Sequence, residues 1–206
     1  MHPAFSVIFL TTLIGVGQGM FLALFTGQSY SAVELLPMQD SHNFYGNGAI
    51  IALLFLIGGL IASFFHLGRP ERAWRAASQW RTSWLSREVI VLPILMFFVF
   101  VYGVMHYFDL DATLFTADTG AQLELSLVIA TFGMIATFAL FICTGMIYAC
   151  LKFLQEWASP LTVINYTLFG TASGFMLATA FANHSAPELM RFYGIWTTII
   201  TLAALA

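Results

Sequence analysis

The feature that most constrains this chain is a series of apolar runs, each about long enough to cross a membrane. A helix needs about 20 apolar residues to span a hydrocarbon layer of about 30 Å. In lipid such runs form helices, because a helix satisfies its own backbone hydrogen bonds. We therefore predict an all-α integral membrane protein, a polytopic bundle that forms one domain over 1–206. Its six spanning helices are expected at 4–26, 46–67, 89–108, 125–151, 161–182 and 192–206.

The composition argues against a soluble protein with a large core. Only 8% of the residues are charged and 60% are hydrophobic, whereas soluble domains carry about 25% charged residues. So few charges cannot cover a surface in water. The two cysteines, Cys143 and Cys150, form no Cys-x-x-Cys motif. The chain therefore has no evident means to hold its own iron–sulfur cluster or structural zinc, and we expect no metal site in it.

Two pairs of glycines mark expected contacts between helices. Gly15 and Gly19 are four residues apart in the first apolar run, and Gly170 and Gly174 have the same spacing in the fifth. This spacing places both glycines of a pair on one helix face and allows another helix to approach closely. We interpret both pairs as packing features.

The connections differ in charge between the two ends of the predicted bundle. One end, with the N-terminus, carries six basic residues; the other carries one, Arg191, and seven acids. The connections at the first end are 68–88 and 152–160, and those at the second are 28–45, 109–124 and 183–191. Basic residues concentrate on the cytoplasmic side of membrane proteins. We therefore predict that the N-terminus and the basic connection face the cytoplasm.

The most basic connection, 69–88, is expected to lie in the membrane interface. Residues 70–84 are predicted to form a short helix, because Pro70 suits a first helical position and Trp80 and Trp84 favour the headgroup level. Two roles stay open for its arginines: contact with lipid phosphates, or docking of a soluble partner, for which arginine offers directional bonds to carboxylates. The candidate docking residues are Arg69, Arg72, Arg75 and Arg81.

One histidine and one glutamate are candidates for proton exchange at this basic end. His66 ends the second apolar run and Glu88 begins the third, so both lie at one membrane face. Ser86 is the expected N-cap of the third helix, with Glu88 in its first turn. Gly58 and Ala62 share a helix face with His66 and leave room for a ligand or for another helix. Histidine titrates near neutrality. A proton-exchange site and a structural interfacial histidine both stay open.

The segment HLGRPERAWRA, followed by SWLSREV, resembles the motif region of the membrane anchor subunits of the dimethyl sulfoxide reductase family of complex iron–sulfur molybdoenzymes. The opening HPAFSVIFLTTLIGVGQGMFLAL is similar to that of the sulfite-oxidising relatives. The resemblance implies an eight-helix anchor without haem, whereas six helices are predicted here, which leaves the last two helices of the family unaccounted for. It also implies the bacterial inner membrane and two partner subunits, a four-cluster iron–sulfur protein and a molybdopterin-containing catalytic protein.

The same resemblance implies electron exchange with a quinone, either menaquinone or ubiquinone. The quinone-site histidine of the family falls on His66 and its glutamate on Glu88, where they would hydrogen-bond the quinone oxygens and pass protons. The arginine-rich connection would dock the iron–sulfur subunit on the same face. A cytoplasmic position favours sulfite oxidation over an exported reductase. The candidate quinone-binding residues are His66, Glu88, Arg87, Trp84, Gly58 and Ala62.

Other functional classes stay open. A haem b electron-transfer subunit needs two axial ligands at similar depth, which excludes His66 with His106 but allows His106 with His184. A transporter often has polar or broken helices near the midplane; here Gln18 is the main deep polar residue, and no strong inverted repeat is visible. A passive anchor without a quinone site is a third class.

Overall fold

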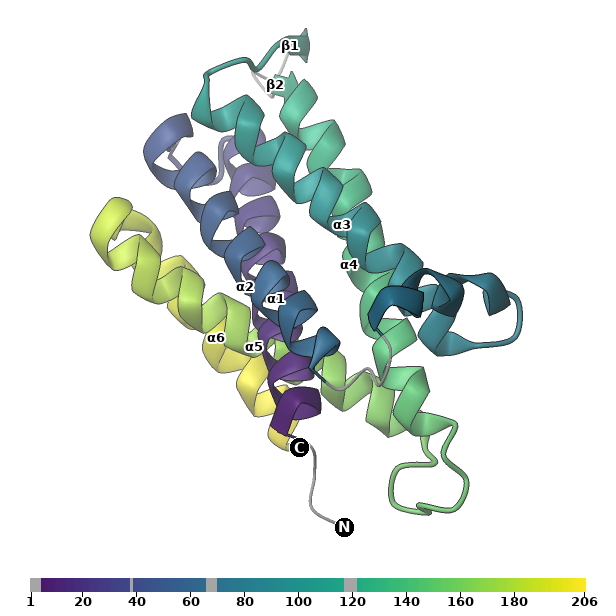
Figure 1. The fold of residues 1–206 in the computed structure, drawn as a ribbon. Helices are drawn as coiled ribbons and strands as arrows, with labels where there is room; N and C mark the ends of the chain where they lie inside the picture. The colour runs from purple at the N-terminus through teal and green to yellow at the C-terminus, as the bar shows by residue number, and fades with distance from the viewer. Residues whose placement is uncertain (1–4, 38, 66–69, 117–121) are drawn as a thin grey trace.

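The computed structural model describes residues 5–37, 39–65, 70–116 and 122–206. Most of this described chain is helical, and one short antiparallel hairpin contains its two strands (Figure 1). The elements in chain order are α1 (Phe5–Ala32), the π-helix η1 (Ser41–Gly46), α2 (Asn47–Phe64), the 3-10 helix η2 (Pro70–Gln79), α3 (Trp84–Tyr107), β1 (Thr113–Thr116), β2 (Gln122–Glu124), α4 (Leu125–Ala149), α5 (Pro160–Ser185) and α6 (Pro187–Leu205).

The predicted all-α membrane fold is confirmed. Within the described residues, five helical segments are long and apolar enough to cross a membrane: α1, η1 continued by α2, α3, α4 and α5. The sixth predicted run corresponds to α6, which begins earlier, at Pro187, and packs along α5. The number of six spans stays a prediction. Large apolar side chains such as Phe97 and Ile135 are more than half exposed on the bundle, as expected of a surface that faces lipid.

Helix α3 begins earlier than the sequence predicted. Its N-cap is Ser83, which has an extended backbone and a hydroxyl that accepts a hydrogen bond from the Ser86 N–H at 3.4 Å. The prediction of Ser86 as the cap was therefore wrong. Trp84 is the first residue of α3, whereas η2 ends at Gln79, so the helix predicted over 70–84 ends earlier than expected. The sequence predicted Glu88 in the first turn of this helix. Because α3 begins at Trp84, Glu88 lies beyond the first turn, and this prediction was wrong.

Helix α1 is the centre of the bundle. It packs against α2, α4 and α5, while α3 pairs with α4 and α5 pairs with α6 (Figure 1). Four residues in its middle, Met20, Phe21, Ala23 and Leu24, have no exposed surface. Near-consecutive buried positions mean that α1 has neighbours on all sides at this level, so its position determines where the other helices lie.

The two glycine pairs meet each other across the α1–α5 contact. A Cβ atom built on Gly15 would lie 3.4 Å from the Gly170 Cα. A Cβ on Gly19 would lie 2.9 Å from the Gly174 Cα and would overlap the Gly170 carbonyl oxygen. The two helix backbones are therefore in direct contact. This confirms the interpretation of both pairs as packing features.

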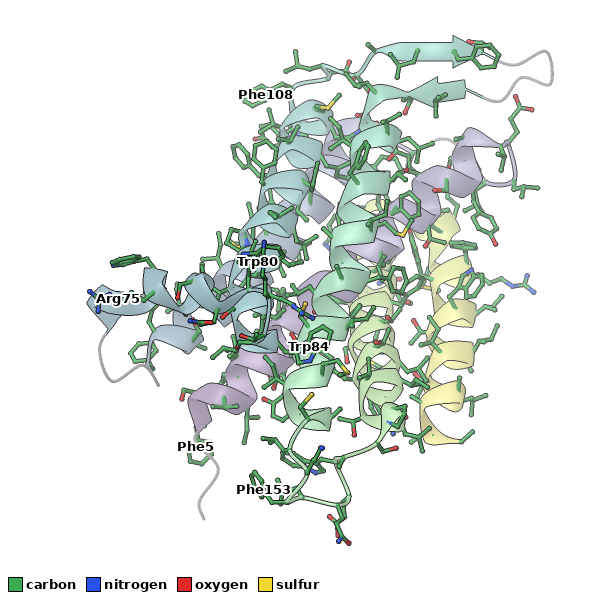
Figure 2. All side chains as sticks on the ribbon, turned by 90° about the vertical axis from the view of Figure 1, so that its right-hand side faces the viewer. Phe5, Arg75, Trp80, Trp84, Phe108 and Phe153 are labelled. Carbon is green, nitrogen blue, oxygen red and sulfur yellow. The ribbon has the colours of Figure 1, made fainter. Side chains whose placement is uncertain are left out.

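The connections alternate between two ends of the bundle, as the sequence predicted. The N-terminus of α1 and the α4–α5 connection lie at one end, here called the basic end (Figure 1), and η2 belongs to the α2–α3 connection on the same side of the chain's alternation. The β1–β2 hairpin, η1 and the α5–α6 junction belong to the other, here called the hairpin end. Figure 2 shows η2 projecting sideways from the bundle beside α3, with Arg75 toward its outer part. Which end faces the cytoplasm stays a prediction.

Candidate functional site

Glu88 is buried inside the bundle toward the basic end. It lies on α3, is 7% exposed, and its Oε1 accepts a hydrogen bond of 2.6 Å from the Thr144 hydroxyl on α4. Thr144 is itself 1% exposed. A buried carboxyl within a membrane-spanning helix is costly to maintain, and such residues commonly serve function. The α3–α4 contact thus holds an oriented group that can exchange a proton.

Arg87 and Trp84 join η2 to the start of α3. The Arg87 guanidinium donates hydrogen bonds to the carbonyl oxygens of Trp80 and Arg81, both at 2.9 Å. Its Cζ lies 4.1 Å from the centre of the Trp84 ring, within the range of a cation–π contact. These contacts fix the turn between η2 and α3. They give both residues a structural role beside the predicted quinone-binding one, which stays a prediction.

Gly58 and Ala62 lie along an apolar groove between α1 and α2. The groove has a volume of about 380 Å³, and α1 contributes Ser6, Phe9 and Leu13 to it. Glu88 is not among its described lining residues. Gly58 and Ala62 therefore line one groove, between α1 and α2. Glu88 pairs with Thr144 at a different contact, between α3 and α4.

Three of the predicted site residues cannot be placed within these arrangements. His66 and Arg69 lie outside the described residues, as does the side chain of Arg72. The predicted pairing of His66 with Glu88 at a quinone pocket therefore stays a prediction.

The exposed part of η2 and the turn that follows it combine arginines with tryptophans. Trp74 is 71% exposed and Trp80 is 53% exposed. The Cζ of Arg75 lies 5.3 Å from the Trp74 ring centre, and that of Arg81 lies 5.3 Å from the Trp80 ring centre. We call the segment 70–82 the cationic arm. It offers positive charge and aromatic surface together, a combination suited to lipid headgroups or to an acidic protein surface.

At the hairpin end, a cavity of about 730 Å³ with both polar and apolar lining residues lies between the end of α1, the loop after it, η1 and the end of α3. The sequence did not predict this cavity. His106 lines it and is 2% exposed, with its Nδ1 2.7 Å from the Ser41 hydroxyl. His184 is exposed and is not part of the described lining. The haem alternative with His106 and His184 as ligands stays a prediction.

A hydrogen-bond network crosses one wall of this cavity. The Gln28 Nε2 donates to the Glu124 Oε2 at 3.1 Å and to the Ser126 hydroxyl at 2.7 Å. The Asp111 Oδ1 accepts from the backbone N–H groups of Ala112 and Ser126, at 2.9 and 3.0 Å. Burial raises the pKa of Glu124, the hydrogen bond from Gln28 opposes the shift, and the nearby Asp111 charge adds to it. Across the described chain, no group of three or more His, Cys, Asp and Glu side chains is arranged to hold a metal ion.

Comparison with known proteins places the chain among membrane anchor subunits. The model of the family described as DMSO reductase anchor subunit (DmsC) matches residues 1–206. The chain is 59% identical over all its 206 residues to a sulfite dehydrogenase subunit of Allochromatium vinosum and spans 63% of the length of that protein. No solved structure matches it. The chain belongs to the DMSO reductase anchor subunit family, as the motifs around Arg69 and Glu88 predicted.

Proposed function

We propose that the chain is the membrane anchor of a three-subunit molybdoenzyme that oxidises sulfite and passes the electrons to the quinone pool. Membership of the anchor family and the similarity to a subunit of a sulfite dehydrogenase support this proposal. The structural observation that carries it is the buried Glu88–Thr144 pair, which lies toward the same end of the bundle as the cationic arm. With Glu88 and the cationic arm on the same side, an iron–sulfur subunit docked on the arm would deliver electrons close to the group that exchanges protons.

The proton chemistry is assigned to Glu88 and His66. Reduction of a quinone to a quinol takes up two electrons and two protons, so the protein must deliver protons to two oxygen atoms. Glu88 provides one proton-exchanging group, and Thr144 holds its Oε1 in a fixed orientation. His66 provides the second. General acid–base groups of this kind contribute about 10²- to 10⁴-fold to a rate.

The apolar groove along Gly58 and Ala62 is the proposed path for the isoprenoid tail. It is lined mainly by apolar side chains of α1 and α2, including Phe9 and Leu13. Trp84 and Arg87 would border the quinone headgroup where the cationic arm joins α3. The cation–π contact between them keeps both side chains in place. A groove of this kind admits an apolar tail from the surrounding lipid without exposing it to water.

The cationic arm is the proposed docking site for an iron–sulfur subunit with an acidic surface. Arg75 and Arg81 are exposed and each is oriented by a neighbouring tryptophan. Arg69 and Arg72 belong to the same basic stretch of sequence. Docking here, with a molybdopterin-containing catalytic subunit bound beyond it, would place an iron–sulfur cluster near Glu88. In the proposed orientation the arm faces the cytoplasm of a bacterial inner membrane.

Co-purification tests the proposal as a whole. A tag on the full-length anchor should retain an iron–sulfur subunit and a molybdenum-containing subunit from solubilised membranes. The purified complex should reduce a soluble quinone analogue in the presence of sulfite. Purification of the anchor without either subunit, or a complex that reduces quinone with other substrates but not with sulfite, would contradict it.

A charge reversal tests the docking surface separately. Arg75→Glu together with Arg81→Glu should release the soluble subunits from membranes, because both arginines are exposed on the arm. Arg191→Glu is the matched control, since it reverses an exposed charge at the hairpin end. Full retention of the subunits by the double variant would instead assign the arm to lipid phosphates.

A further inference from the structure

The cavity at the hairpin end has no part in the proposed quinone chemistry, which lies toward the other end of the bundle. Its volume, about 730 Å³, lies within the range of about 300–1,000 Å³ typical of small-molecule sites. That is far more space than a single metal ion occupies. Its walls combine apolar side chains, such as Leu35, Leu36 and Pro37, with polar groups. This composition is typical of a site for an organic molecule.

Several buried polar atoms in the cavity wall have no hydrogen-bond partner in the described chain. They include the Gln28 Oε1, the His106 Nε2 and the Asp111 Oδ2. Gln28 is 3% exposed and His106 is 2% exposed. Buried polar groups in native proteins nearly always have a partner. Two of these three atoms, the Gln28 and Asp111 oxygens, can only accept hydrogen bonds. A group that satisfies these two oxygens, whether water or a ligand, has to donate hydrogen bonds to them.

The charge of the cavity wall favours a cation. Four carboxylates line it, those of Glu34, Asp109, Asp111 and Glu124, and no lysine or arginine is among its described lining residues. A protonated primary amine carries one positive charge and three donors on a single nitrogen. It can bind a carboxylate and an amide oxygen at the same time. Tyr45 also lines the cavity, and a tyrosine ring attracts cations to its face.

We propose that this cavity binds the protonated primary amine of a small organic molecule, with Asp111 and Gln28 accepting its hydrogen bonds. The apolar wall at Leu35, Leu36 and Pro37 contacts the carbon body of the ligand. Two sources supply this chemistry at a membrane surface: a free amine in the aqueous space, and the headgroup of phosphatidylethanolamine. The site is independent of the proposed quinone chemistry.

The test is calorimetric titration of ethanolamine into the full-length protein in nanodiscs of phosphatidylcholine and phosphatidylglycerol. We expect saturable binding with one site per chain. Tetramethylammonium is the matched probe, because it has the same charge but no N–H donor, and it should bind at least about tenfold more weakly, equivalent to ~1.4 kcal/mol. Addition of phosphatidylethanolamine to the nanodiscs separates the two sources: loss of ethanolamine binding identifies the lipid headgroup, and unchanged binding identifies a free amine.

A pair of isosteric variants locates the site. Asp111→Asn should weaken ethanolamine binding about tenfold or more, while its Oδ1 can still accept the two backbone N–H groups. Glu156→Gln removes one charge from the exposed α4–α5 connection at the basic end and should leave binding unchanged. The proposal is overturned by an absence of saturable ethanolamine binding to the wild-type protein, which would leave the cavity to water. Equal affinity for tetramethylammonium, or unchanged binding in Asp111→Asn, also overturns it.

Discussion

Replacement of Gly174 by alanine is expected to separate α1 from α5 and to destabilise the bundle. A Cβ atom at this position would overlap the Gly19 carbonyl carbon and the Met20 nitrogen of α1. Both are backbone atoms, so no side chain can rotate away to make room. The two helices must therefore shift relative to each other, and α1 packs against α2, α4 and α5. A change at one glycine thus reaches the centre of the molecule.

The expected cost follows from the nature of these contacts. Inserting a methylene-sized group into a well-packed core costs about 1–3 kcal/mol. We expect the upper half of this range for Gly174→Ala, because the overlapping atoms belong to a helix backbone. A loss of roughly 2–3 kcal/mol raises the unfolding equilibrium constant about 30- to 150-fold.

Reversible unfolding of the full-length protein in mixed detergent micelles measures this free energy. Gly194→Ala is the control, because a Cβ there would meet only the Thr179 Cγ2, at 3.9 Å, an ordinary van der Waals distance. It should leave the free energy of unfolding unchanged or raise it slightly, since alanine favours a helix over glycine. Equal free energies of unfolding for the Gly174→Ala and Gly194→Ala variants would refute the direct backbone contact between α1 and α5.

Three further predictions concern the Glu88 partner, the start of α3 and the topology. Thr144→Val should lower quinone-coupled turnover of the complex about tenfold or more while Thr144→Ser retains it, because only serine keeps the hydroxyl that donates to Glu88; equal turnover in both would contradict this role. Ser83→Ala should lower the free energy of unfolding by ~1 kcal/mol through loss of the N-cap bond, and an unchanged value in the same unfolding assay would argue against the cap. Cysteines placed at Gln79 and Leu114 should react with an impermeant reagent from opposite sides of the membrane, and labelling of position 79 from outside intact cells would reverse the orientation.

The spanning helices could be predicted because run length alone identifies them. A run of about 20 apolar residues has one stable backbone form in lipid, whatever its neighbours. The glycine pairs were predictable for a related reason, since four-residue spacing puts two small residues on one helix face. The exact start of α3 was not predictable in this way. Ser83 and Ser86 are both chemically suitable caps, and the choice depends on the backbone conformation at Ser83 and on the turn that Arg87 holds.

The arrangement around the candidate residues depends on contacts that the sequence does not display. Glu88 bonds to Thr144, a residue on the next spanning helix 56 positions away, and both helices are apolar around much of their circumference. Periodicity therefore could not indicate which face of α3 turns toward α4. The cavity at the hairpin end joins Gln28 to Glu124, 96 residues apart. The sequence does show polar residues at the ends of the apolar helices. It does not show which of these residues lie next to each other in the folded protein.

The most direct test of the central claim is the turnover of a complex that carries Glu88→Gln. Glutamine has nearly the same size and can still accept the hydrogen bond from Thr144, so the fold and the assembly should persist. Unlike the carboxyl group of Glu88, the glutamine amide does not take up or release a proton near neutral pH. We predict that sulfite-dependent reduction of a quinone analogue falls about 10²-fold or more, while sulfite oxidation with a soluble dye as acceptor, and both activities of a Glu156→Gln control, stay at the wild-type level. Wild-type quinone turnover in Glu88→Gln would contradict the assignment of proton exchange to this residue.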